Sequence, residues 1–243
     1  EKSVSYVMAI PRLTSDIEDP QMLIDRLLEA EDFEVVSFSY DEEKDNPMVD
    51  ILYQGESFHL DFFLEDFVLP ELFTINHLLT EEDYTLLQES EVGITTAMIF
   101  GENAQQSYHL QIKVLAAMIP NMAGIMDFSS ERIISGVWAD MAALSQVPPA
   151  PTYLYSMQAV SNNDGQVWLH THGLNRCGLI ELEIVDTNET QYQNHSTILG
   201  TIASRAVSEG KLEDEKEPIL ALNFPNGIIV AAWENFADAI MKY

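Results

Sequence analysis

Residues 167–178 of this chain read Val-Trp-Leu-His-Thr-His-Gly-Leu-Asn-Arg-Cys-Gly. The stretch contains two of the six histidines and the single cysteine of the sequence. We predict a β-strand over 166–172 that ends in a turn bracketed by Gly173 and Gly178. The Asn-Asn-Asp-Gly segment at 162–165 joins it to an earlier strand over 153–160, because an Asp-Gly turn favours a two-stranded hairpin.

The rest of the C-terminal part continues this pattern. Residues 179–185 predict a third strand, and a second hairpin is expected from strands over 219–224 and 228–232 around Pro-Asn-Gly. Between them lies one long amphipathic helix that extends to Gly210. Its apolar face recurs at intervals of three and four residues, at Tyr192, His195, Leu199, Ile202 and Ala206.

Three prolines at 148, 149 and 151 mark a boundary, because proline removes backbone donors and fixes an extended chain. Before it, strands are predicted over 4–10, 33–40, 49–53, 57–64, 93–100 and 124–128. One helix follows Asp19-Pro20, a second follows the capping box at Thr80, and two more cover 103–119 and 130–144.

Two of these helices carry stripes that we expect to be buried in the core. In the first helix Leu23, Leu27 and Ala30 share a face. In the helix over 130–144, the residues that face one way are Ile134, Val137, Trp138 and Met141.

Strands and helices alternate without a regular βαβ rhythm, which favours an α+β fold over a doubly wound sheet. We expect two mixed layers: an N-terminal sheet with packed helices, and a hairpin-rich C-terminal sheet with one long helix. The expected domains are 1–147 and 152–243, with one continuous unit as the alternative.

The composition is strongly acidic. Forty acidic against 11 basic residues give a formal net charge of −29, which repels phosphate backbones and anionic membranes. Neither nucleic acid nor membrane is therefore an expected partner, and no apolar run approaches the roughly 20 residues that span a bilayer. A single cysteine cannot form an internal disulfide, so the expected location is the cytoplasm.

His170 and His172 are the first candidates for chemistry. Residues two apart in a strand share a face, so both imidazoles can converge on one ion such as zinc. A third ligand would come from His195, Glu181, Glu183 or Cys177, none of which has a diagnostic spacing. The alternative is a structural pair at a strand end, hydrogen-bonded to backbone or acidic neighbours, with no cofactor.

Cys177 beside Arg176 is a second candidate, since a guanidinium stabilises a thiolate and His172 would act as base. A small buried thiol is the alternative, as is an ion pair for Arg176 with Glu181 or Glu183. The sequence has no phosphate-binding glycine loop and no Gly-x-Ser-x-Gly element.

Several segments together carry a family resemblance. They are Trp-Leu-His-Thr-His-Gly-Leu at 168–174, Gly-Leu-Ile-Glu-Leu-Glu at 178–183, Gln-Ala-Val at 158–160, Tyr-His-Leu-Gln-Ile-Lys at 108–113 and Trp-Ala at 138–139. From Ser5 to Tyr243 the chain resembles a bacterial family of domains of unknown function found in cytoplasmic proteins. The resemblance implies an uncharacterised bacterial protein and supplies no catalytic residue.

The leading functional hypothesis is a non-enzymatic binding or interaction module for a protein or small-molecule ligand. A metal-dependent hydrolase that uses the His-Thr-His strand end is the alternative. A peptide groove formed by Trp138, Trp168 and Trp233 is a third hypothesis, and a homodimer through an edge strand of either hairpin stays open.

Overall fold

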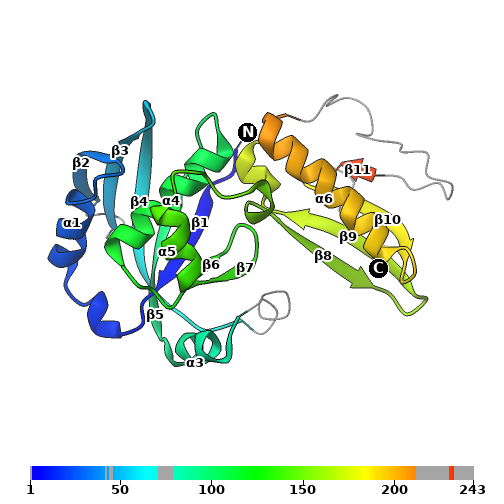
Figure 1. The fold of residues 1–243 in the computed structure, drawn as a ribbon, viewed down its shortest axis with the longest axis horizontal. Helices are drawn as coiled ribbons and strands as arrows, with labels where there is room; N and C mark the ends of the chain where they lie inside the picture. The colour runs from blue at the N-terminus through cyan, green and yellow to red at the C-terminus, as the bar shows by residue number, and fades with distance from the viewer. Residues whose placement is uncertain (1, 42, 44–45, 71–78, 212–229, 233–243) are drawn as a thin grey trace. The chain divides into compact units, whose positions relative to one another are not determined.

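The computed structural model of this chain describes residues 2–41, 43, 46–70, 79–211 and 230–232. They form five α-helices and two antiparallel sheets, so the predicted α+β class is confirmed. The chain divides into two compact units, one comprising Val4–Pro149 and the other Ala150–Tyr243 together with Glu1–Ser3 (Figure 1).

The first unit is built on a seven-stranded sheet of order β2-β3-β4-β5-β1-β6-β7, in which every neighbouring pair is antiparallel. The strands are β1 (Ser5–Ile10), β2 (Glu34–Asp41), β3 (Asn46–Tyr53), β4 (Glu56–Asp66), β5 (Val92–Met98), β6 (Gly124–Asp127) and β7 (Arg132–Ser135).

Helices cover both faces of this sheet. The helices are α1 (Pro20–Leu28), α3 (Glu81–Glu89), α4 (Ala104–Met118) and α5 (Gly136–Leu144), and a short 3₁₀ turn, η1, covers Thr14–Asp16. On one face Gln111 of α4 bonds to Ser5 of β1 and Thr96 of β5, and α1 and α5 contact α4. On the other face, Leu87 of α3 packs with Met8 of β1. Side chains alternate between the two faces along a strand, so Met8 points away from the face to which Ser5 points.

Two helix starts follow the predicted capping chemistry. The Asp19 carboxylate accepts hydrogen bonds from the backbone N–H groups of Gln21 and Met22, ahead of Pro20. Thr80 and Asp83 cap the start of α3 reciprocally. The predicted core stripe of α1 is only partly correct, because Leu27 alone is fully buried while Leu23 and Ala30 are half-buried.

The prediction of one helix over 130–144 is wrong in its first part. Residues 132–135 form β7, which pairs with β6 and buries Ile133 and Ile134. The helix begins only after Ser135, whose hydroxyl accepts a hydrogen bond from the N–H of Trp138. Its predicted core stripe is also wrong, since Val137 is 57% exposed and Met141 is 67% exposed.

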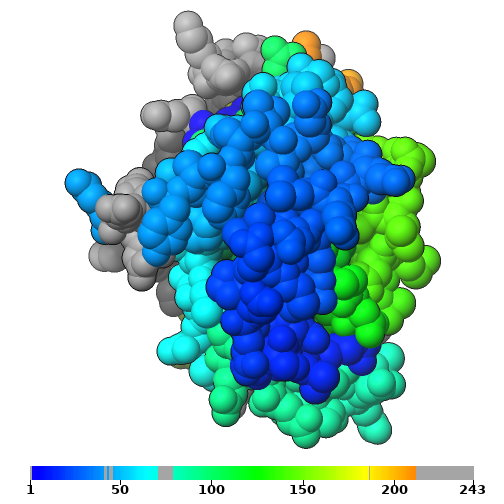
Figure 2. Space-filling model, turned by 90° about the vertical axis from the view of Figure 1, so that its left-hand side faces the viewer, coloured from blue at the N-terminus to red at the C-terminus, as the bar shows by residue number. Residues whose placement is uncertain are grey.

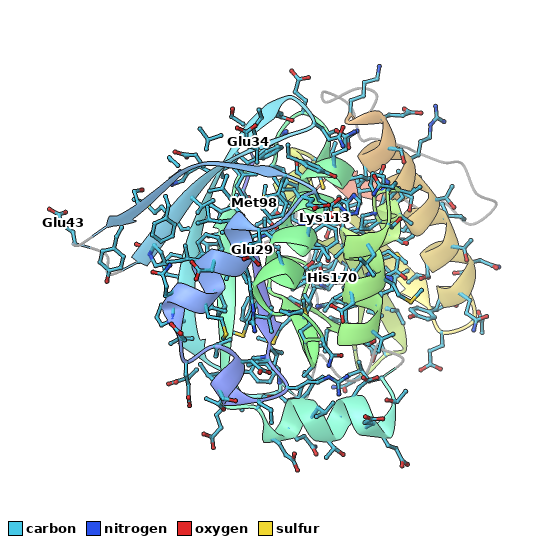
Figure 3. All side chains as sticks on the ribbon, turned by 60° about the vertical axis from the view of Figure 1, so that its left-hand side comes forward. Glu29, Glu34, Glu43, Met98, Lys113 and His170 are labelled. Carbon is cyan, nitrogen blue, oxygen red and sulfur yellow. The ribbon has the colours of Figure 1, made fainter. Side chains whose placement is uncertain are left out.

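A buried lysine of α4 secures the end of α5. The Lys113 ammonium donates hydrogen bonds to the backbone carbonyls of Ala143 and Ser145 and lies 3.2 Å from a carboxylate oxygen of Asp32 (labelled Lys113 in Figure 3). A cation at the C-terminal carbonyls of a helix satisfies acceptors that have no partner within the helix. Its burial is therefore explained by a structural role.

The second unit contains a four-stranded antiparallel sheet of order β11-β10-β9-β8, with β8 (Ser156–Ser161), β9 (Gln166–His172), β10 (Leu182–Asn188) and β11 (Val230–Ala232). Short 3₁₀ turns η2 (Pro151–Tyr153) and η3 (Leu174–Cys177) flank β8 and β9. The single long helix is α6 (Tyr192–Glu209), which ends at Gly210 in the left-handed conformation, close to the predicted bounds.

The third predicted strand begins later than expected, at Leu182, because residues 174–177 fold into η3 and the chain is still turning at Leu179. The strand predicted over 219–224 and Trp233 lie outside the described residues. Within the described part of the chain, no helix combines the length and apolar character needed to cross a bilayer.

Candidate functional site

His170 lies in the middle of the second sheet. Its partner on β8 is Gln158, and its partner on β10 is Glu183. Directly paired residues point to the same face of a sheet, and so do residues two apart in one strand. This face therefore brings together Trp168, His170, His172 and Glu183, which we call the β9 cluster.

The three rings of the β9 cluster are in contact. The His170 ring stacks on Trp168 with centroids 4.0 Å apart and meets the edge of His172 at 4.8 Å. The side chain of His170 is buried, and burial together with the charge of His172 lowers the pKa of His170 from its usual value to about 4. His170 is therefore a neutral imidazole at pH 7.

Glu183 completes the β9 cluster from the next strand. The indole N–H of Trp168 donates a 2.9 Å hydrogen bond to Oε2 of Glu183, whose side chain is fully buried. Burial raises the pKa of the Glu183 carboxyl, and the hydrogen bond from Trp168 opposes that rise. Trp168 is 5% exposed, so its indole is not available to line the peptide groove of the third hypothesis.

Glu181 organises the turn that follows β9. Its carboxylate accepts hydrogen bonds from the Thr171 hydroxyl at 2.7 Å and from the N–H groups of Gly173 at 2.8 Å and Asn175 at 3.2 Å. The Thr171 hydroxyl also accepts a hydrogen bond from the N–H of Leu182. Thr171 and the Glu181 carboxylate therefore connect the two ends of the turn. Burial raises the pKa of Glu181, against the effect of these hydrogen bonds.

The same turn buries Arg176 and Cys177. The Arg176 guanidinium donates two hydrogen bonds to the carbonyl oxygen of Leu154, at 2.7 and 3.2 Å. The thiol of Cys177 is buried and points to the carbonyl oxygen of Gly173 at 3.9 Å. Arg176 therefore holds the turn against the backbone just before β8, and Cys177 is a small buried thiol within the turn.

The structure does not bring His195 to the other two histidines. Nδ1 of His195 on α6 bonds to the Thr187 hydroxyl, and Thr187 pairs with Val167 on the opposite face of the sheet from His170. Burial lowers the pKa of His195. Among the residues that the structure describes, no group of three His, Cys, Asp or Glu side chains is placed to hold a metal ion.

A second candidate site lies in the first unit, and the sequence alone did not reveal it. A cavity of about 550 Å³ opens between α1 and the sheet, and its lining is apolar or aromatic throughout. We call it the α1 groove. One wall is formed by the α1 residues Pro20, Leu23, Ile24 and Leu27, and the other by strand residues that include Phe38, Phe62, Leu64 and Ile94.

Side chains on both walls of the α1 groove are only partly covered. Leu23 and Ile24 are half-buried, while Leu64 is 67% exposed and Phe38 is 42% exposed at the mouth. Figure 2 looks onto the side of the unit where α1 lies, in dark blue. A periodic apolar stripe signals burial against something, but sequence does not tell whether that partner belongs to the same chain.

The fold and these two sites define a two-part α+β protein whose described residues include an apolar groove and a buried aromatic cluster. The chain belongs to the family described as Protein of unknown function (DUF4026). The N-terminal model of the family matches residues 5–149 and the C-terminal model matches residues 157–243. Comparison with curated proteins and with solved structures finds no match in either.

Proposed function

We propose that this chain is a non-enzymatic binding module and that the α1 groove is its ligand-binding site. The observation that carries the proposal is the cavity of about 550 Å³ with an apolar lining. Ligand sites are typically concave, mostly apolar and about 300–1,000 Å³ in volume. The half-exposed state of Leu23 and Ile24 supplies the driving force, because a ligand that covers them removes apolar surface from water.

The expected affinity is moderate. Burial of one methylene contributes about 0.8 kcal/mol, so an apolar group of about eight carbons gains about 6 kcal/mol before the entropy of association is subtracted. That gain corresponds to a Kd on the order of 10 to 100 μM at best. An affinity in this range suits reversible capture of an apolar group.

We further propose that the protein works in a bacterial cytoplasm, without nucleic acid or membrane as a partner. A single cysteine, which is buried, suits a reducing compartment. The net charge of −29 disfavours phosphate backbones and anionic lipid surfaces.

Binding is tested with N-phenyl-1-naphthylamine, an uncharged apolar dye whose emission rises in an apolar site. Two variants place an amide in the groove, Leu64→Gln at its mouth and Leu23→Gln on α1. Met141→Gln on α5 is the matched control, because Met141 is equally exposed and lies outside the groove.

We expect saturable dye binding to wild type and to Met141→Gln, and binding about five-fold weaker in each groove variant, the equivalent of about 1 kcal/mol. Leu64 is exposed, so Leu64→Gln leaves the fold intact even if Leu23→Gln does not. Absence of dye binding to wild type, or equal binding in Leu64→Gln, would overturn the proposal.

A further inference from the structure

Exposed carboxylates lie beside the α1 groove where α1 begins. Glu18 and Asp19 lie between the groove residues Ile17 and Pro20 in sequence. Both acidic side chains are exposed, and the Asp19 carboxylate caps the start of α1. Three more exposed glutamates, Glu29, Glu34 and Glu43, continue along α1 and β2 to the β2–β3 hairpin (labelled in Figure 3).

Few positive charges offset these carboxylates. The segment 14–45 contains Asp or Glu at twelve positions and a basic residue only at Arg26 and Lys44. The Arg26 guanidinium donates to the backbone carbonyl of Met118. The apolar groove therefore lies in a strongly acidic part of the chain.

The wall of the groove formed by α1 has the pattern of a helix–helix interface. Its residues Pro20, Leu23, Ile24 and Leu27 follow the spacing i, i+3, i+4 and i+7. A stripe with this spacing forms ridges into which the side chains of a second helix fit. The nine residues of α1 extend for about 14 Å, which is enough for two to three turns of a partner helix.

We propose that the occupant of the α1 groove is a basic amphipathic helix of another protein. This inference rests on the proposed function and specifies its ligand. Leucine-like side chains of the helix enter the groove, and its lysines and arginines are attracted to Glu18 and to the acidic segment 14–45 around the groove. A second copy of this chain does not fit, because it would bring another net charge of −29 to a chain that is already strongly acidic.

The test uses a fluorescein-labelled peptide of about 16 residues with leucine at i, i+3, i+4 and i+7 and lysine elsewhere. Its binding is followed by anisotropy and by displacement of N-phenyl-1-naphthylamine. Two control peptides are a scrambled sequence of the same composition and a leucine–glutamate peptide with the same apolar pattern.

We expect the patterned basic peptide to displace the dye and to bind wild type at least ten-fold more tightly than the scrambled peptide. Leu64→Gln should weaken its binding about five-fold, and Glu18→Gln about two-fold. Met141→Gln and Glu89→Gln, an exposed site on α3, should leave it unchanged. The leucine–glutamate peptide should not bind.

Each contrary result has a distinct meaning. Dye binding without displacement by the basic peptide would overturn this inference and leave the apolar binding site in place. Equal binding of the patterned and scrambled peptides, unaffected by Leu64→Gln, would overturn the inference, because it would show that the peptides only adsorb to the acidic surface. Failure of the dye itself to bind would remove both the inference and the proposed function.

Discussion

Replacement of His170 by glutamine should change how the stability of the protein depends on pH. The folded protein lowers the pKa of His170 from 6.5 to about 4, while in the unfolded chain the imidazole keeps its ordinary pKa. Above pH 6.5 the imidazole is neutral in both states. As the pH falls below 6.5, the unfolded chain binds a proton that the folded protein does not, and the free energy of unfolding decreases.

The size of this effect follows from the shift. The slope is about 1.4 kcal/mol per pH unit, and the total loss is about 3 kcal/mol by pH 4, where the folded protein also takes up the proton. Glu181 and Glu183 act in the opposite direction, because their raised pKa values let the folded protein bind protons first as the pH falls. The difference between wild type and His170→Gln isolates the histidine.

The assay is urea denaturation of wild type, His170→Gln and the non-titrating control Met141→Gln, at several pH values between 7 and 4. The slope should be smaller in His170→Gln by about 1 kcal/mol per pH unit or more, and unchanged in the control. Identical slopes in wild type and His170→Gln would refute the claim that His170 is buried as a neutral imidazole.

Three further predictions concern single features. In Gly136→Ala the added Cβ would lie 1.8 Å from the backbone oxygen of Met122, so thermal unfolding should show a loss of about 3 kcal/mol; an unchanged melting temperature would contradict this close approach. Glu181→Ala removes the carboxylate that accepts hydrogen bonds from the backbone N–H groups of Gly173 and Asn175, so denaturant titration should show that the free energy of unfolding falls by about 3 kcal/mol. A fall of less than about 0.5 kcal/mol would contradict this role of Glu181. Elemental analysis should find no stoichiometric zinc, and zinc that disappears in the His170→Ala/His172→Ala variant would make the metal-dependent hydrolase the leading hypothesis.

Much of the fold was predictable because local chemistry sets its boundaries. Asp19 and Thr80 are side-chain caps that sequence shows directly, and structure and pattern agree at both. The region around Ser135 was not predictable in the same way. Ile133 and Ile134 suit a strand as well as a helix, and their pairing with β6 decides between the two.

The two candidate sites differ in what the sequence could reveal. The proximity of His170 and His172 follows from strand geometry alone. Glu183 lies beside them because of the register between β9 and β10, and it accepts the hydrogen bond of Trp168. His195 lies away from them because α6 covers the other face of the sheet. Both arrangements depend on how distant segments pair, which the sequence does not show. The α1 groove arises from a gap between a helix and a sheet, and periodicity reports which face is apolar, not how closely it is covered.

The central claim, that the α1 groove binds an apolar group, is tested most directly by methyl NMR during a titration with 1-decanol, an uncharged ligand. The account predicts saturable shifts of the methyl signals of Leu23, Ile24 and Ile94, which line the groove, with those of Val137 and Leu144 on α5 unchanged. Shifts confined to the α5 methyls, or no saturable shift at the groove methyls, would contradict it.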